Sequence, residues 1–463
     1  CCQGDGVGSR ARDIVVSEVS MKKRVITGMA GWILMLMSAH VTGSAYAAEL
    51  ERPVPELRLS LRDAIEASMG NNPTVRLFVE RIMEARGVEH TNRGPLLPNV
   101  SASLSATRQK FFLGQFDIGA DAVRGPFNVF DYRGFLTQNL FSLSLIQRWR
   151  AARTGVKVAH LEAEVTKRDT MATVGLLYVD ALRAEAAVRA VEANLELDQQ
   201  LLDLAEDRKA AGLATGLDVT RAQVQVQRDR QALVATKNSR EISKLNLIRA
   251  IGIDFEVKLI LTDELKLVEV ESQPVHDALA VANQNRFELK AQKRREKLAA
   301  LTLSSVTSEY VPSLNFDGNL GSIGNFYDET VDTFSASFLF SIPIWDGGSR
   351  DGRISETRSL LRQEQIRMKD VSAQVTLEVR DALLTQASTH ELVLVSQEAL
   401  RLALKELELS RERFAVGVTN NVEVTNAQVS VALARNSLVV ALSNFNSARI
   451  NLARAQGRLE SLY

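Results

Sequence analysis

The chain has 463 residues and a formal net charge of +0, because 56 Lys and Arg balance 56 Asp and Glu. This balance excludes the strongly basic surface that binding to nucleic acid or to an acidic membrane face requires. Its two cysteines are Cys1 and Cys2, which excludes a disulfide scaffold and a cysteine-rich metal site further along the chain.

Residues 21–47 have the features of a secretory signal. A positive Met-Lys-Lys-Arg segment is followed by an apolar run over 25–37 and by the small-x-small site Ala45-Tyr46-Ala47. The run is short for a retained helical anchor, which needs about twenty residues. We therefore expect the exported chain to begin near Ala48 without an N-terminal lipid, and residues 1–20 to be an over-extended N-terminus.

Most of the remaining chain contains one plan twice. Asp63-Ala64 opens a helical pattern that reaches Leu97-Pro98, and the same pattern runs from Asp277-Ala278 to Val311-Pro312. So long a period indicates a duplicated, domain-sized unit rather than a solenoid of short repeats. The sequence predicts a first structural repeat over 48–260 and a second over 261–463.

Two segments of the repeats alternate with the period of a β-strand. In the second repeat, Phe334, Ala336, Phe338 and Phe340 alternate with mostly polar residues, and in the first repeat Val100, Ala102, Leu104 and Ala106 alternate with Ser and Thr. Strands with one apolar face suit a transmembrane β-barrel, and they equally suit a soluble sheet with one buried face. We predict β-hairpins at about 99–142 and 313–345, with tips near Gly114–Arg124 and Gly321–Asp332.

Two proline-free tracts predict very long helices, because proline is costly inside a helix. The sequence predicts helical hairpins at about 145–252 and 349–457. Two apolar stripes run along each long helix; in the second repeat one contains Leu392, Val395, Ala399, Leu402 and Leu409, and the other contains Leu400, Ala403 and Leu407. Two stripes imply two packed neighbours, either in a closed ring of helices or in an ordinary bundle.

A glycine-containing turn joins the two helices of each predicted hairpin. Gly212 and Gly417 stand where a long helix stops, at the position where a left-handed residue costs least as glycine. Thr215-x-x-Asp218 and Asn420-x-x-Glu423 then resemble capping boxes for the returning helices. Four strands per chain cannot satisfy their edges in lipid, so a membrane-embedded sheet requires further subunits.

These features together resemble the TolC family of outer-membrane efflux proteins. The resemblance rests on the duplicated plan, on Leu97-Pro98 and Val311-Pro312 before the strands, on the segment 342–348 that leaves a strand for the second long helix, and on the two turns. It implies an α+β membrane protein: a homotrimer whose 12-stranded β-barrel, four strands per chain, lies in outer-membrane lipid and continues as a long antiparallel coiled-coil α-helical barrel.

The same resemblance implies a function and partners. The chain is expected to be the outer-membrane channel of a tripartite efflux or type I secretion system, a passive exit duct extending into the periplasm. It would dock on a periplasmic adaptor (membrane fusion) protein coupled to an inner-membrane transporter of the RND, ABC or MFS type. The expected docking surface is the pair of hairpin tips, with residues Gly212, Leu213, Ala214, Thr215, Val416, Gly417 and Val418.

The resemblance also places a periplasmic gate just inside these tips. Asp218 and Glu423 match acidic gate positions, in addition to their expected role in helix capping. A ring of Glu423 around a threefold axis would favour cations. Asn426 occupies a position that is acidic in the best-known pattern. Phe414 stands where an aromatic hydroxyl bonds the acid of the first hairpin, and Thr419 where an arginine holds the gate closed. We therefore expect a gate that is held differently.

Other classes of function have less support. The five histidines, His40, His90, His160, His276 and His390, are scattered without metal-ligand spacing, and no Gly-Lys-Ser/Thr follows Gly347-Gly348. No enzyme activity, metal or cofactor is expected. The remaining alternative is an exported, elongated coiled-coil structural or adaptor protein with a small β-domain, which explains the helices but not the duplicated strand pairs.

Overall fold

The computed structural model describes residues 55–112, 123–269, 273–419 and 421–462. The predicted signal over 21–47 and the predicted over-extended N-terminus lie outside these ranges. The chain divides into two compact units, and the large one contains residues 57–255 and 259–463. The described part of the small unit is limited to 55–56 and 256–258, where the Lys258 Nζ lies 2.7 Å from the Glu56 Oε1.

Eight helices in the described part carry the duplicated plan. They are α2 (Leu61–Asn71), α3 (Pro73–Arg93), α4 (Leu143–Ala210) and α5 (Gly216–Ile251), followed by α6 (Val275–Asn285), α7 (Phe287–Thr307), α8 (Ser349–Ala415) and α9 (Asn421–Gln456). Short 3-10 helices lie at Gly94–Leu96, Ser308–Tyr310 and Leu459–Leu462. Helix α4 has 68 residues and is therefore about 100 Å long. None of the described helices is both long and apolar enough to cross a membrane.

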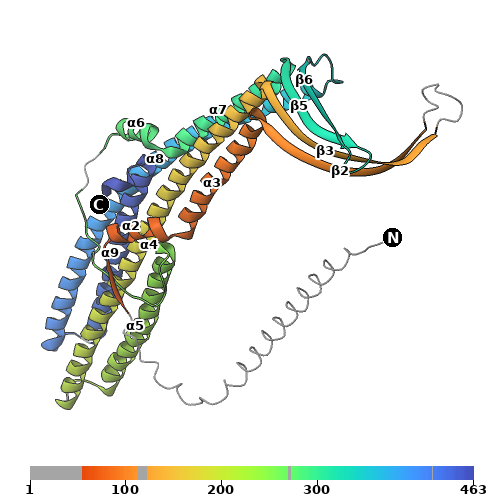
Figure 1. The fold of residues 1–463 in the computed structure, drawn as a ribbon. Coiled ribbons are helices and arrows are strands. Elements are labelled where there is room, and N and C mark those ends of the chain that lie inside the picture. Colours follow the sequence, from red (N-terminus) through yellow and green to blue (C-terminus); the bar gives the residue numbers. More distant parts are fainter. Residues whose placement is uncertain (1–54, 113–122, 270–272, 420, 463) are drawn as a thin grey trace, which may run out of the picture. The chain divides into compact units, whose positions relative to one another are not determined.

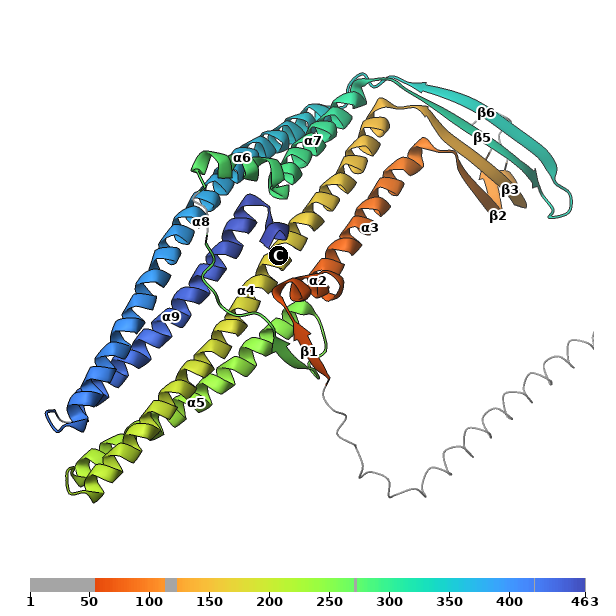
Figure 2. The same ribbon diagram turned by 90° about the vertical axis from the view of Figure 1, so that its left-hand side faces the viewer.

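The two long helices run the length of a layer that the shorter helices complete (Figures 1 and 2). Helix α4 packs against α3 over one part of its length and against α5 over the other, and α8 packs in the same way against α7 and α9. Helix α4 also contacts α7 and α9. The layer is thus ordered α3–α4–α7–α8 in the part next to the strands and α5–α4–α9–α8 in the part that ends at the turns.

A shared hydrogen-bond arrangement joins the two parts of this layer. The Asn72 side chain caps α3 and its Nδ2 donates to the Ala250 carbonyl near the end of α5, at 2.7 Å. In the second repeat Arg286, which precedes α7, donates from Nη1 to the Ala455 carbonyl near the end of α9, at 3.3 Å. Space at the end of α5 is tight, because a Cβ on Gly252 would lie 2.6 Å from a backbone oxygen. The two junctions, α5 with α3 at Asn72 and α9 with α7 at Arg286, therefore depend on a few polar contacts.

The strands form two sheets. A two-stranded sheet pairs β1 (Glu56–Leu59) with β4 (Lys258–Leu261), and a four-stranded antiparallel sheet has the order β2–β3–β5–β6. Its strands are β2 (Asn99–Phe112), β3 (Val123–Phe141), β5 (Ser313–Gly324) and β6 (Val331–Ser341).

The predicted hairpins are present, but the predicted second tip, Gly321–Asp332, is too long. Strand β5 continues to Gly324 and β6 already begins at Val331, because Ile323 and Val331 still pair across the ladder. Most of the first predicted tip, Gly114–Arg124, lies outside the described residues, and its last two residues belong to β3.

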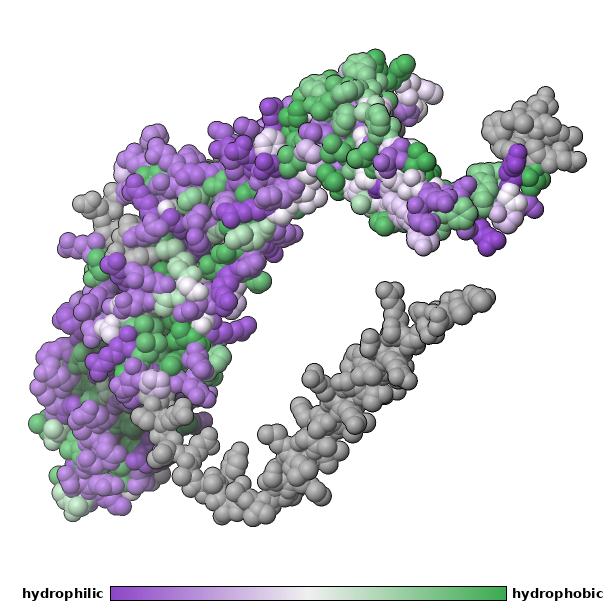
Figure 3. All heavy atoms as spheres, viewed as in Figure 1, coloured by the Kyte–Doolittle hydropathy of each residue, from purple (hydrophilic) through white to green (hydrophobic). Residues whose placement is uncertain are grey.

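Between the register shifts at Gln109/Phe111 and Asn139/Phe141, the ladder keeps the even-numbered residues of all four strands on one face of the sheet. Directly opposed residues share a face, and the ladder pairs Val100 with Leu136, Leu136 with Gly318, and Gly318 with Ala336. This even face is apolar and uncovered in the single chain: Val100 is 80% exposed and Phe334 is 81% exposed. In Figure 3 hydrophobic side chains gather over β5 and β6, whereas the visible helical surface is mostly hydrophilic.

The odd-numbered face of the same sheet carries a polar network. Arg133 on β3 pairs with Asp131 and donates to Asn319 Oδ1 on β5, at 2.6 Å, and to Thr333 Oγ1 on β6, at 3.3 Å. Asn319 in turn donates to the Ser335 hydroxyl. The sheet therefore separates an apolar surface from a hydrogen-bonded polar one.

Candidate functional site

The first hairpin turn has the local structure that its sequence predicts. Helix α4 ends before Gly212, which adopts a φ of +75°, and the Leu213 N–H donates to the Arg208 carbonyl at 2.8 Å. Thr215 then caps α5 in a complete capping box. Asp218 accepts hydrogen bonds from the Thr215 hydroxyl, at 2.7 Å, and from the Thr215 N–H, at 3.0 Å. These hydrogen bonds, foremost among several causes, lower the pKa of Asp218.

The second turn repeats this backbone with different side-chain contacts. Gly417 has a φ of +80°, and the Val418 N–H donates to the Arg413 carbonyl at 3.0 Å. The predicted cap residue Asn420 lies outside the described residues, so its capping box stays a prediction. Glu423 accepts a hydrogen bond from the Thr419 hydroxyl and forms an ion pair with Arg413, at 3.2 Å. Thr419 therefore holds the acid from the position where the family pattern expects an arginine.

Phe414 is buried where the two hairpins pack together, and its ring has no hydroxyl to bond the acid of the first one. It is 6% exposed and belongs to a cluster formed by α4, α8 and α9 that contains Leu201, Ala403, Leu407, Val424, Ala427 and Val431. Arg208 of α4 lies over its ring, with 4.3 Å between Cζ and the ring centroid, and also donates from Nη1 to the Phe414 carbonyl. A cation–π contact and a backbone hydrogen bond thus join the first hairpin to the second at this point.

The other predicted gate residues are only partly brought together. Asn421, at the start of α9, donates from Nδ2 to the Asp218 carbonyl at 3.3 Å, which is a second link between the hairpins. The Asp218 carboxylate is engaged by Thr215, and the Glu423 carboxylate by Thr419 and Arg413. Asn426 is exposed.

Sequence reasoning missed Arg208 and Arg413. Each stands four residues before the turn glycine of its repeat, Gly212 or Gly417, and offers its carbonyl to the residue after that glycine. This shared Arg-x-x-x-Gly spacing was the available signal. The two side chains have diverged: Arg208 reaches the other hairpin, whereas Arg413 remains beside Glu423.

The tips themselves present apolar side chains to solvent. Leu213, Val416 and Val418 are all exposed, and so are the two turn glycines. The described residues contain no group of three or more His, Cys, Asp or Glu that could hold a metal ion. The site is therefore a surface with buried interhelical links behind it.

Comparison with known proteins decides the family. The family model for outer membrane efflux proteins matches the chain twice, over residues 64–253 and 278–458. The chain belongs to the outer membrane efflux protein family. The family is one of transport channels, and channels of this family are trimeric and work with adaptor proteins and inner-membrane pumps.

Individual relatives are distant but match over most of their length. The probable efflux pump outer membrane protein TtgC of Pseudomonas putida is 22% identical over 414 residues, covering 86% of this chain and 83% of TtgC. The outer membrane protein TolC of Escherichia coli is 22% identical over 423 residues, covering 88% of this chain and 80% of TolC. The crystal structure of the CmeC outer membrane channel of Campylobacter jejuni superposes with a TM-score of 0.77 at 14% identity, covering 86% of each chain.

These findings confirm the predicted fold class, class of function and location. The chain has the duplicated α+β fold of the trimeric channels, with a β-barrel that continues into an α-helical barrel. It is an outer-membrane channel protein of tripartite efflux or secretion systems, located in the outer membrane and extending into the periplasm.

Proposed function

We propose that three copies of this chain form one passive conduit. The hairpin tips of the conduit dock on a periplasmic adaptor coupled to an inner-membrane pump. The contacts of Arg208 and Glu423 hold the periplasmic end of the conduit closed. The observation that carries the proposal is an uncovered apolar stripe on α8. One predicted stripe of this helix, Leu400, Ala403 and Leu407, packs inside the chain. The other, Leu392, Val395, Ala399, Leu402 and Leu409, is exposed along its whole length.

The exposed stripe on α8 has coiled-coil spacing and requires a partner helix, because it leaves a long row of large apolar side chains in water. The opposite edge of the same layer offers one. Helices α5 and α3 each have a long helix on one side only, and they expose Leu77, Val79, Met83, Val224, Val234, Ile242 and Leu245. Joining the α8 edge of one copy to the α3 and α5 edge of the next closes a ring that covers both edges.

The sheet supports the same assembly. Its edge strands β2 and β6 have unpaired edges, which lipid does not tolerate. Pairing β6 of one copy with β2 of the next in a ring of three closes a twelve-stranded barrel. The apolar even face then contacts outer-membrane lipid, and the polar face around Arg133 lines the lumen.

The gate and docking assignments rest on the hairpin geometry. The exposed tips Gly212, Leu213, Ala214 and Thr215, with Val416, Gly417 and Val418, offer short apolar surfaces to an adaptor. Threefold symmetry would place three copies of Glu423, and of Asp218, around one axis, with Asn426 one helical turn further in. Phe414 and Thr419 serve as anchors for the contacts that close the aperture rather than as charged members of the ring.

The experiment compares two α8 variants that each add one negative charge. Leu402→Glu places a charge in the exposed stripe, whereas Gln397→Glu places one at an exposed position of the same helix outside the stripe. We expect the wild type and Gln397→Glu to be trimers by light scattering in detergent and to conduct in planar bilayers. Leu402→Glu should shift toward monomer and lose conductance. A monomeric wild type, or a Leu402→Glu trimer as stable as the wild type, contradicts the proposal.

A further inference from the structure

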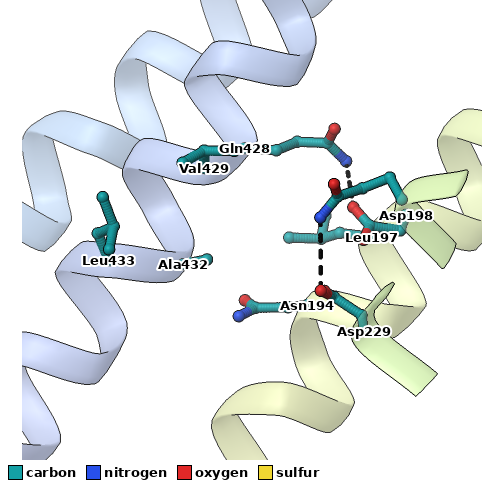
Figure 4. Close-up of a pocket in the computed structure, with 9 residues that line it drawn as sticks. Asn194, Leu197, Asp198, Asp229, Gln428, Val429, Ala432 and Leu433 are labelled. Atoms are coloured by element: carbon teal, nitrogen blue, oxygen red, sulfur yellow. Dashed lines mark hydrogen bonds between the residues drawn. The ribbon is translucent and has the colours of Figure 1, made fainter. Parts of the chain in front are cut away.

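The helical hairpins form a pocket that the conduit proposal does not use (Figure 4). It has a volume of about 230 Å³ and lies where α4, α5 and α9 meet. Its lining residues are Asn194, Leu197, Asp198, Gln225, Asp229, Gln428, Val429, Ala432 and Leu433. Two of them are carboxylic acids from different helices, Asp198 on α4 and Asp229 on α5, and both line this one pocket.

Asp198 is the more buried of the pair, with 4% of its surface exposed. Its Oδ1 accepts a hydrogen bond from Gln428 Nε2 of α9, at 2.8 Å. Its Oδ2 is buried and receives no hydrogen bond from any N–H or hydroxyl group of the described residues. Leaving a carboxylate oxygen in this state is costly, so the geometry calls for a hydrogen-bond donor at Asp198 Oδ2.

We propose that the donor is a proton shared by Asp198 and Asp229, and that this proton fastens α5 to α4, so that its loss loosens the first hairpin. With Asp198 protonated, Oδ2 becomes a hydroxyl that donates to the Asp229 carboxylate. Deprotonation releases the proton to solvent and leaves two negative charges in one pocket, with Asp198 buried and Asp229 partly exposed. Burial of Asp198 strengthens the repulsion between these charges.

The surrounding groups favour a proton over a metal ion. Gln428 and Gln225 point N–H donors, not carbonyl oxygens, at the two acids, the latter with 3.4 Å between Gln225 Nε2 and Asp229 Oδ1. Hard cations prefer a shell of oxygen ligands, and with both amides turned this way the two carboxylates are the lining groups that present oxygens to the space between the acids. The nearest cation from α9 is Arg435, and it is engaged with Asn194 Oδ1 at 2.6 Å. No basic side chain therefore neutralises the pair among the residues that line the pocket.

The titration of Asp198 agrees with this geometry. Burial, and then the neighbouring Asp229, raise the pKa of Asp198 to about 7. The packed hairpin therefore binds the proton more tightly than a loosened one, in which an aspartate has a pKa of about 3.9. The packed arrangement is fully favoured below about pH 4, loses stability as the pH rises toward about 7, and changes no further above that.

The Asp198–Asp229 pair lies further from the turns than the proposed gate. Asp198 precedes Gly212 by fourteen residues, which is about 20 Å along α4. Gln428 ties the same carboxyl group to α9, so the pair contacts both hairpins. Periplasmic acidification should thus stiffen this end of the chain.

Hydrogen exchange on the purified full-length protein tests the proposal without relying on conductance or on the conduit. After correction for intrinsic exchange, we expect opening of the α5 segment around Asp229 to rise by up to about tenfold per pH unit between about pH 5 and pH 7. Asp198→Asn mimics the protonated acid and should abolish this rise. Asp229→Asn removes the facing charge and should move the rise to lower pH.

The matched control is Asp203→Asn, which removes an exposed carboxylate from the same helix that also has an amide partner, Gln199. It should behave as the wild type. An equal rise in the wild type and Asp198→Asn overturns the proposal, as does the absence of a rise in the wild type. If added Mg²⁺ or Ca²⁺ restores protection at pH 8 in the wild type but not in Asp198→Asn, the pocket holds a metal ion and the shared proton is wrong.

Discussion

Arg208 of the first hairpin stacks on Phe414 of the second, with 4.3 Å between the guanidinium carbon and the ring centroid. The same guanidinium donates a hydrogen bond to the Phe414 carbonyl. Two residues 206 positions apart thereby join the helical hairpins next to their turns. In the conduit proposed above, this contact is a direct candidate for the element that closes the periplasmic end.

Replacing Arg208 should favour the open state. In Arg208→Gln both the cation–π contact and the charged hydrogen bond are lost, and together they contribute about 1–2 kcal/mol. We expect the open probability of reconstituted channels to rise by about tenfold. Lys209→Gln removes a positive charge from the same turn at an exposed position and should leave gating unchanged. Equal gating in both variants would assign the closing role to other contacts.

Glu423 should set ion preference. In the proposed gate its three copies would form a negative ring at the aperture, and Arg413 forms an ion pair with each Glu423. Glu423→Gln should reduce the cation preference measured from reversal potentials in a salt gradient, and should weaken block by multivalent cations. The control is Glu412→Gln, which changes an exposed residue in the last helical turn of α8, just before the second hairpin turn. An unchanged reversal potential in Glu423→Gln would remove Glu423 from the aperture.

The capping box of α5 should respond to pH. The hydrogen bonds from Thr215 lower the folded-state pKa of Asp218, so their stabilisation is present above about pH 4 and is lost as the pH falls through the lowered value. Thr215→Val should cost the first turn of α5 about 1 kcal/mol at neutral pH, seen as faster amide exchange over 216–219, and less in acid. Thr220→Val removes a hydroxyl that bonds within the helix and should have little effect.

The two faces of the sheet should tolerate charge differently. Leu104→Arg puts a guanidinium on the lipid-facing side and should cost up to about 2–4 kcal/mol, depending on its depth in the bilayer. Ser105→Arg faces the lumen, directly opposite Asp131, and should be tolerated. Folding yield in lipid vesicles, followed by the shift of the barrel band in gels, measures both. Similar yields for the two variants would reverse or abolish the assignment of the faces.

Most of the architecture was predictable because it is local and repeated. The long proline-free tracts, Gly212 and Gly417 gave the helical hairpins, and the alternation in β6 gave its apolar face. Strand β3 was harder, since Phe135 on its polar face and Gln138 on its apolar face interrupt the alternation. Its register is fixed by pairing with β2 and β5, which no local pattern reveals.

The candidate gate was only partly predictable for the same reason. Asp218 follows its N-cap at a fixed spacing, so its capping contact could be read directly. The partners of Phe414 and Asp198 come from other helices, Arg208 across the hairpins and Asp229 across the first hairpin. Contacts of this kind depend on how helices pack, and sequence spacing along one helix contains no information about them.

The junctions at Asn72, between α3 and α5, and at Arg286, between α7 and α9, have a mechanical consequence. Among the described helices, only α4 and α8 pass unbroken from the strands to the turns, while their shorter neighbours meet end to end through a few hydrogen bonds. The layer of helices is therefore weakest where these shorter helices meet. Twisting of the turn-side half can be absorbed there, so that a dilating aperture need not transmit torque to the part of the protein that is sealed into lipid.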